Sequence, residues 1–308
     1  MFTLKTDNDR LLLASPDLRA EIYLYGGLLN RYEIRRPDGT WFNIVKAYDT
    51  PQHARESLTE WFRSGKLSPY ACRLRHGKYS FDGKAYQCGK FKLAEHAAHG
   101  LMYDREFALV NSHADGQSAE VEIRADYAQD DSGYPFPFSL TVRYLLSADG
   151  LSIRSTVRNQ GTTAMPLADG WHPYFMLGGK TDDWSLEIDS SKRLGFDADL
   201  VPDGSIIDDT RFQTTSSLAG IELDNSFVLA RQKPTACTLS GNGLTLSIYP
   251  DASYPYLQIF TPSTRDTIAI ENLSGAPDCF NNGLGLIKLD AGEEAAFETR
   301  YHIAANRP

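Results

Sequence analysis

Hydrophobic and polar residues alternate in short runs along most of the chain. The clearest runs cover residues 19–25, 119–127, 139–146 and 151–157, and further ones cover 186–189, 244–249, 256–260, 267–270 and 294–302. Alternation of this kind is typical of strands that bury one face. Pairs such as Asp38-Gly39, Asp82-Gly83 and Asp149-Gly150 punctuate the chain and favour tight turns. The pattern predicts a nearly all-β chain joined mostly by hairpins.

A helical pattern of any length occurs once, near residues 53–62. Because helices do not alternate with strands, the pattern argues against a parallel α/β sheet. No Ser/Gly-rich linker, low-complexity block or fixed-period repeat divides the chain. We therefore predict one domain over residues 1–308, an all-β protein folded as a large antiparallel β-sandwich with few short helices. Such a sandwich can present a groove on its concave face.

Charge and composition narrow the classes of partner. The 308 residues include 31 Lys+Arg against 40 Asp+Glu, a net charge of −9, which disfavours nucleic acid as a ligand. No run approaches the roughly 20 apolar residues of a membrane helix, and the first ten residues lack a basic-then-apolar export pattern. We expect a cytoplasmic protein without membrane or nucleic-acid partners. Both a monomer and a homodimer fit the sequence.

Cysteine and histidine spacing gives little support for a metal. Cys72, Cys88, Cys237 and Cys279 are widely separated and form no Cys-x-x-Cys pair, so we expect reduced thiols. The three-residue spacing of His96 and His99 lacks a third ligand or a recognised zinc pattern. The expectation is a protein without metal.

Two residues stand out as candidate acid and base. His172 lies in Asp169-Gly-Trp-His-Pro-Tyr-Phe175, where rigid aromatic neighbours would hold one tautomer of the ring. Glu271 follows a predicted strand and is expected where that strand enters a loop. The commoner roles of such residues are a core histidine bonded to backbone and a solvated carboxylate. Pattern alone favours these structural roles.

Three polar residues are weaker candidates. Arg73 and Arg75 alternate like strand residues, so they would share one face and grip hydroxyls or a phosphate, although a solvated basic face is more common. Asp224 lies in Leu223-Asp-Asn-Ser-Phe227, where an Asx turn is the simplest role. The chain lacks a phosphate-binding Gly-rich loop and a Gly-x-Ser-x-Gly elbow, which disfavours nucleotide hydrolysis and serine esterase chemistry.

Five segments in order resemble the landmarks of the aldose 1-epimerase (galactose mutarotase) family. They are Cys72-Arg73, His99-Gly100, His172-Pro-Tyr-Phe175, Asp224-Asn-Ser-Phe227 and Glu271. The resemblance implies a galactose mutarotase-like supersandwich and interconversion of the α and β anomers of a sugar, with no cofactor. It implies that Glu271 is the general base and His172 the general acid. It further implies that His99 polarises the ring oxygen, while Arg73 and Asp224 hold sugar hydroxyls.

The chain departs from the family pattern at two places. Cys72 stands where galactose-active members typically carry Asn, and Leu101-Met102 follow His99-Gly100 where a further glycine is usual. Loss of the amide donor and acceptor suggests that one hydroxyl contact is lost, replaced or made by water. The preferred sugar therefore stays open. Apolar contact with the sugar is expected from some of the aromatic residues Trp171, Tyr174 and Phe175.

Three alternatives to a mutarotase of free aldoses remain. The first is a hexose-6-phosphate 1-epimerase with a phosphate site built from Arg63, Lys66, Arg73 and Arg75. The second is a non-catalytic carbohydrate-binding protein, which the presence of both candidate catalytic residues disfavours. The third is a glycoside hydrolase, whose two carboxylates would be Glu271 and Asp224.

Overall fold

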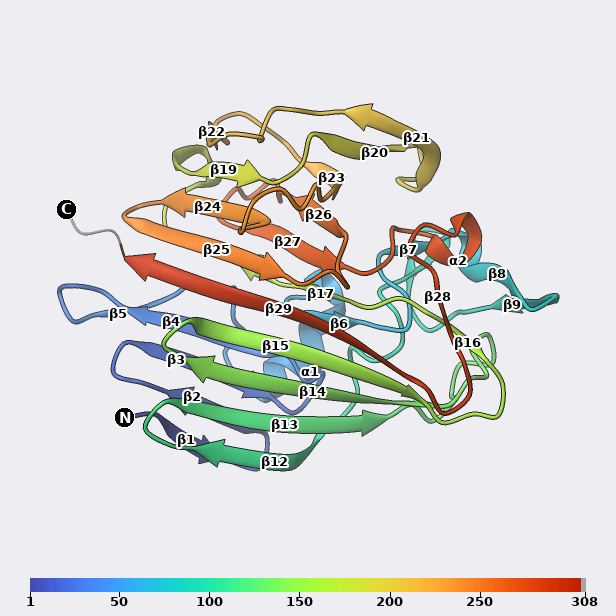
Figure 1. Cartoon of the computed structure of the whole chain (residues 1–308), viewed down its shortest axis with the longest axis horizontal. Coiled ribbons are helices and arrows are strands. Elements are labelled where there is room, and N and C mark those ends of the chain that lie inside the picture. The colour runs from blue at the N-terminus through green and yellow to red at the C-terminus, as the bar shows by residue number, and fades with distance from the viewer. Residues whose placement is uncertain (306–308) are drawn as a thin grey trace.

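Antiparallel strands make up about half of the described chain, residues 1–305 of a computed structural model (Figure 1). The largest sheet has nine strands, and its long central members pair over eight to ten residues. Alternate residues along them are buried, as the sequence pattern predicts. In spatial order the strands are β12 (Ala108–Ala114), β13 (Ser118–Asp126), β14 (Phe138–Ser147), β15 (Gly150–Asn159), β29 (Glu294–Ala305), β25 (Leu244–Pro250), β24 (Cys237–Gly241), β19 (Ser185–Ile188) and β22 (Ser216–Ser217).

A second sheet of eight strands carries most of the candidate site. Its central strand β27 (Ile268–Leu273) is buried at every position, because side chains cover both of its faces. The order around it is β21 (Pro202–Asp208), β20 (Lys192–Phe196), β23 (Asp224–Val228), β26 (Tyr256–Phe260), β27, β17 (Gly170–His172) and β6 (Gly65–Leu67), with β18 (Tyr174–Phe175) also paired to β27.

The remaining strands form four smaller sheets. Five N-terminal strands are β1 (Thr3–Thr6), β2 (Arg10–Ala14), β3 (Leu18–Tyr23), β4 (Leu29–Arg35) and β5 (Trp41–Asn43). The others are β10 (Lys92–Leu93), β11 (His96–Ala98) and β7 (Arg73–Leu74), the hairpin β8 (Lys78–Phe81) and β9 (Lys84–Gln87), and the pair β16 (Met165–Leu167) and β28 (Ile287–Leu289). One buried apolar cluster includes side chains from the five-, eight- and nine-stranded sheets, for example Leu13, Ile259 and Ile123.

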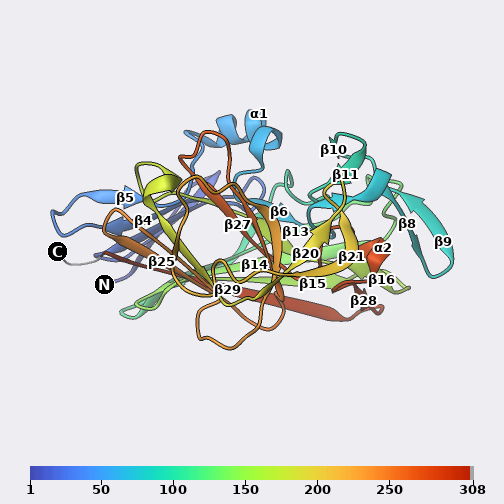
Figure 2. The ribbon, with the colours of Figure 1, turned by 90° about the horizontal axis from the view of Figure 1, so that it is seen from above.

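Helices are few and short, which agrees with the sequence prediction. The longest is α1 (Pro51–Trp61), where a helix was expected, and it lies outside the layers of strands (Figure 2). The Thr50 hydroxyl accepts a hydrogen bond from the His53 amide, and Pro51 takes the first turn. Phe62 ends the helix in the left-handed region with φ of 51°. The others are α2 (Cys279–Asn282) and the 3₁₀ turns Arg75–Gly77 and Thr181–Asp183.

Candidate active site

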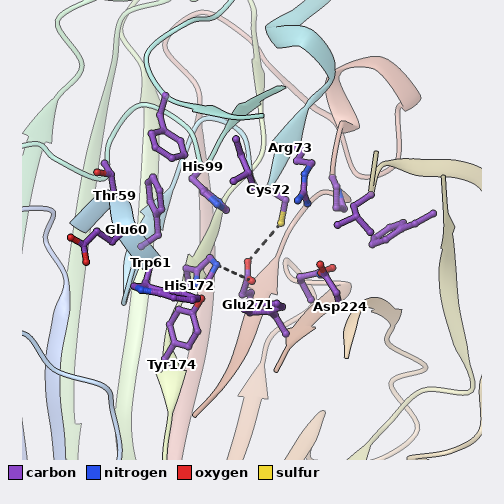
Figure 3. Close-up of a pocket in the computed structure, with 18 residues that line it drawn as sticks. Thr59, Glu60, Trp61, Cys72, Arg73, His99, His172, Tyr174, Asp224 and Glu271 are labelled. Carbon is purple, nitrogen blue, oxygen red and sulfur yellow. Dashed lines mark hydrogen bonds and ion pairs between the residues drawn. The ribbon is translucent and has the colours of Figure 1, made fainter. Parts of the chain in front are cut away.

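One cavity of about 300 Å³ collects all five predicted site residues (Figure 3). They come from separate parts of the chain, and the eight-stranded sheet forms the floor on which several of them stand. Such a volume is at the lower end of small-molecule sites and suits a single sugar ring. The lining residues are Thr59, Glu60, Trp61, Phe62, Cys72, Arg73, Phe91, Leu93, His99, His172, Tyr174, Phe196, Leu200, Asp224, Gln258, Phe260, Glu271 and Pro277.

Glu271 and His172 meet at the centre of the cavity. His172 Nε2 lies 3.2 Å from Glu271 Oε1, and the two residues are 7% and 2% exposed. His172 is the last residue of β17, whereas Glu271 lies inside β27 and is paired with Gln258 of β26. The expectation that Glu271 stands where a strand enters a loop is therefore wrong. The ladder continues to Leu273, which fixes the carboxylate more firmly than a loop would.

Burial favours the uncharged forms of both groups. The pKa of Glu271 is raised well above its usual value by burial and by the nearby charge of Asp224. Burial lowers the pKa of His172 to about 4. At a pH between the lowered pKa of His172 and the raised pKa of Glu271, the pair holds one acidic proton. This proton can lie on the carboxyl or on the imidazole without any change in the total number of protons. The pair can therefore present a carboxylate and an imidazolium without taking up a proton from solvent.

His99 forms the wall beside this pair. Its ring centroid is 5.2 Å from that of His172 and 4.4 Å from that of Phe62. Burial, and then the neighbouring His172, lower the pKa of His99 well below the usual value. Gly100 allows this placement, since its φ is +74° and a Cβ there would lie 2.3 Å from the Ser68 carbonyl oxygen. His99 is thus a neutral hydrogen-bonding group in an apolar surrounding.

Arg73 and Asp224 occupy the opposite side of the cavity (Figure 3). Asp224 Oδ1 accepts a hydrogen bond of 2.6 Å from Gln258 Nε2, and Gln258 Oε1 accepts one of 2.6 Å from Ser226 Oγ. Burial raises the pKa of Asp224, while Arg73 opposes this shift. Gln258 was not among the residues predicted from the sequence. Its polar side chain on an otherwise apolar strand is the signal that could have found it.

Cys72 contacts the candidate base directly. Its Sγ lies 3.7 Å from Glu271 Oε2, and Cys72 is 7% exposed with φ of +52°. Burial and the charge of Glu271 raise the pKa of the thiol well above its usual value. Cys72 is therefore a weak hydrogen-bond donor to Glu271 and has no thiolate character.

Aromatic residues line the mouth of the cavity, but only some of them are the ones predicted from the sequence. Tyr174 lines the cavity, but Trp171 and Phe175 are buried in the apolar core, so sugar contact by these two is wrong. Trp61, which is 42% exposed at the end of α1, packs edge to face on Tyr174 with centroids 6.5 Å apart. Trp61 was not among the residues predicted from the sequence, because its helix carries no recognised motif.

The four cations proposed as a phosphate site do not converge. Arg75 follows the last residue of β7 and begins a 3₁₀ turn, so it does not share a face with Arg73. Its guanidinium binds the carboxylates of Asp197 and Asp199. Lys66 is fully buried against an aspartate. Arg63 lines a neighbouring cavity of about 130 Å³, which shares its Trp61 and Tyr174 walls with the main one.

His96 and His99 lie in different surroundings. His96 accepts a hydrogen bond from the His76 amide, and His96 does not line the cavity with His99. Within residues 1–305 no three His, Cys, Asp or Glu side chains lie close enough to hold a metal ion. All four cysteines are free and buried. No helix in the described part of the chain is long and apolar enough to cross a bilayer.

Residues 9–302 match the family model described as aldose 1-epimerase. The chain belongs to the aldose 1-epimerase family. Among curated proteins it is 26% identical to the uncharacterized protein YihR of Escherichia coli, over 74% of each chain. It is 28% identical to the uncharacterized protein YphB of the same organism, over 37% of each chain.

Solved structures show the same fold. A galactose mutarotase-like protein from Clostridium acetobutylicum superposes with a TM-score of 0.86 at 16% identity, over 99% of this chain and 98% of that one. A galactose 1-epimerase from Lactobacillus acidophilus gives a TM-score of 0.82 at 19% identity, over 100% and 99%. The predicted family and the mutarotase-like β-sandwich are confirmed.

Proposed function

We propose that the protein is an aldose 1-epimerase that interconverts the α and β anomers of an aldose. The observation that carries this proposal is the buried contact of 3.2 Å between His172 and Glu271 in a cavity the size of a sugar. Anomer exchange requires a base at the C1 hydroxyl and an acid at the ring oxygen. Two neighbouring groups that share one proton meet this requirement.

The proposed reaction begins when the hemiacetal lies against both groups and replaces their mutual contact. Glu271, as carboxylate, takes the proton of the C1 hydroxyl while His172 Nε2, as imidazolium, gives a proton to the ring oxygen. The C1–O5 bond breaks and C1 becomes an aldehyde. After rotation about C1–C2, the C5 hydroxyl attacks the other face of the carbonyl and both proton transfers reverse. The protein returns to its starting state without a cofactor.

The surrounding residues support the charges that develop. Neutral His99 can donate a hydrogen bond to the ring oxygen region without adding charge. Arg73 and Asp224 present a donor and an acceptor to the hydroxyls that follow C1. The low polarity around the pair strengthens each of these hydrogen bonds.

The geometry favours this proposal over the two other classes. A binding protein gains nothing from a carboxyl and an imidazole whose pKa values are both displaced by burial, whereas an acid–base catalyst does. A glycoside hydrolase needs a second carboxyl across the bond as acid or nucleophile. Asp224 is instead held by Gln258, and the group in contact with Glu271 is an imidazole.

Polarimetry tests the proposal. Freshly dissolved α-D-glucose and α-D-galactose approach their equilibrium rotation at a rate that the protein is expected to increase in proportion to its concentration. The matched reference is His172→Asn at the same concentration. Failure to accelerate any of a panel of aldoses, phosphorylated ones included, would overturn the proposal.

A sugar with an anionic group at C6 is the second candidate substrate, and the cavity beside Arg63 favours it. With O5 at His172 and C2 on the side of Asp224, C6 points the other way, toward Trp61 and Tyr174. These two residues also wall the smaller cavity. There Arg63 has no carboxylate within ion-pair distance among residues 1–305, whereas Lys46 is paired with Asp266 at 3.0 Å.

The two substrates can be told apart in one assay series. A coupled assay with glucose 6-phosphate is run beside polarimetry with glucose, for the wild type and for Arg63→Gln. If the anion binds at Arg63, the variant loses at least tenfold in kcat/KM on the phosphate and stays within twofold on glucose. Equal losses on both sugars, or none, would remove the second candidate.

A further inference from the structure

A buried ion pair lies in the interior of the fold and has no part in the proposed chemistry. Lys66 Nζ is 2.5 Å from Asp169 Oδ1, and both side chains are 0% exposed. Burial lowers the pKa of Lys66 to about 8 and raises the pKa of Asp169. Such a pair adds little stability compared with apolar residues of the same size, because both charges lose their hydration. Its presence calls for another role.

The contacts of Lys66 join separate parts of the sandwich. The ammonium donates to Ser155 Oγ on β15 at 3.0 Å and to the Gly170 carbonyl at 3.2 Å, besides Asp169. With these three acceptors all three of its N–H groups are used. Asp169 Oδ1 also accepts from the Tyr254 hydroxyl at 2.7 Å. The pair therefore ties the nine-stranded sheet to β17 and to the segment before β26.

The same residues hold β17 and β27, the two strands that carry His172 and Glu271. Across β6 and β17, Lys66 is opposite Trp171 and Gly65 is opposite His172. The Asp169 amide donates to Ser274 Oγ at 2.7 Å, and the Ser274 amide donates back to the Asp169 carbonyl at 2.9 Å. Asp169 is three residues before His172, and Ser274 is three residues after Glu271. A shift of the ion pair would therefore move both catalytic candidates relative to each other.

We propose that Lys66, Asp169 and Tyr254 form a positioning element that holds β17 and β27 in the register that keeps His172 Nε2 in contact with Glu271. This rests on the proposed function, since it assigns these residues to the same proton-transfer pair. Misplacement of reacting groups by about 1 Å can reduce rates on the order of a hundredfold. The element acts through His172 and Glu271 and touches no substrate.

A matched pair of tyrosine variants tests the positioning role. Tyr254→Phe removes a hydroxyl that donates to Asp169 at 2.7 Å. Tyr79→Phe removes a hydroxyl that donates to the Gly133 carbonyl at 2.8 Å, and Tyr79 lies in β8, outside the sheet that carries His172 and Glu271. Both tyrosines are buried, so the general cost of the deletion is similar. We expect Tyr254→Phe to lower kcat at least fivefold with KM within twofold, and Tyr79→Phe to leave both within twofold.

A second readout does not depend on turnover. The titration of the His172 ring, followed by NMR, starts from a pKa of about 4 in the wild type and is expected to move in Tyr254→Phe and in the double variant Lys66→Met/Asp169→Asn, but not in Tyr79→Phe. An unchanged His172 titration in Tyr254→Phe, or an equal change in Tyr79→Phe, would overturn the positioning role. A wild type without activity on any sugar would instead remove the proposed function, and the titration would still decide the positioning role.

Discussion

The molecule contains two buried acid–base pairs within the same group of strands, and they differ in how their hydrogen bonds are used. In the interior pair, Lys66 spends every N–H group on protein acceptors. In the cavity pair, His172 Nδ1 has no partner among the described residues, and Glu271 Oε2 has only the weak Cys72 donor. The first pair lies in the interior between strands, whereas the second lines the cavity. Unused hydrogen-bonding capacity alone does not mark a reactive group, since Asp169 Oδ2 also lacks a partner among the described residues; the cavity pair differs because a small molecule can reach it.

The largest expected effect comes from breaking the cavity pair. Glu271→Gln and His172→Asn are each expected to lower kcat at least about a hundredfold, because each removes one of the two proton transfers. Polarimetry on the best sugar measures this loss, and circular dichroism checks the fold. His96→Asn is the matched control, since His96 is also buried but bonds only outside the cavity. Near-normal turnover in either cavity variant removes that residue from the mechanism.

Two arginines two residues apart extend the comparison. Arg73 lines the cavity, whereas Arg75 is bound by Asp197 and Asp199. Loss of a charged hydrogen bond to the sugar in Arg73→Ala is expected to lower kcat/KM roughly ten- to a hundredfold. Arg75→Ala is expected to stay within about threefold, because surface ion pairs contribute little. The ratio of the two kcat/KM values is the measurement, and equal losses would contradict the placement of Arg73 against substrate.

The pH profile of kcat/KM should follow the one proton that the cavity pair shares. Activity is expected to fall below about pH 4, where His172 takes up a second proton while Glu271 is still protonated. It is also expected to fall as pH rises through the raised pKa of Glu271, where the pair loses its only acidic proton. Cys72→Asn sharpens this test. An amide donor favours the ionised Glu271, so the alkaline limb should move to lower pH. A profile without an alkaline limb would contradict the shared proton.

The smallest expected effect is on the free energy of unfolding, which Glu271→Gln should increase although it lowers activity. The pKa of Glu271 is raised in the folded chain, so the fold keeps a proton that the unfolded chain releases above its ordinary pKa of about 4.5. The free energy of unfolding therefore decreases as pH rises from this ordinary pKa toward the raised pKa of the folded chain. Glu271→Gln cannot ionise and should be more stable than the wild type at pH 8 by roughly 1 kcal/mol, with no gain at pH 4. Urea unfolding at both pH values measures this difference.

A control carboxylate should behave in the opposite way. The pKa of Glu187 is lowered by its hydrogen bonds with Lys233 and Thr215. Its stabilisation is present above the ordinary pKa and disappears as pH falls through the lowered value. Glu187→Gln should therefore lose stability at pH 8, the reverse of Glu271→Gln. A gain at pH 8 in both variants would show that the effect is not specific to burial of Glu271.

The sequence predicts the strands well where they are long and half-buried, as in β13, β14 and β15, because alternation survives over many residues. It also predicts a helix near residues 53–62, close to α1, but not the start at Pro51 that Thr50 caps. The resemblance to the family named Glu271 and His172, which the pattern alone assigned to structural roles. Their meeting in one cavity depends on sheet topology, which local patterns do not contain.

The failures have equally physical causes. Arg75 was expected on the face of Arg73, but β7 ends after two residues and the chain turns toward Asp197. Lys66 was predicted to be part of a phosphate site. A lysine in a three-residue strand gives no sign in the sequence that its side chain points inward. Successive residues of a strand point to opposite faces, so Trp171 points away from the cavity and its neighbour His172 points into it.

The position of β29 has a consequence for how the chain is made. Although it is the last strand of the described chain, β29 lies between β15 and β25 near the middle of the nine-stranded sheet. During synthesis both neighbours therefore present open backbone edges until residues 294–305 have emerged from the ribosome. The two halves of this sheet therefore cannot join before β29 is made, and the open edges of β15 and β25 are where a chaperone would protect the growing chain.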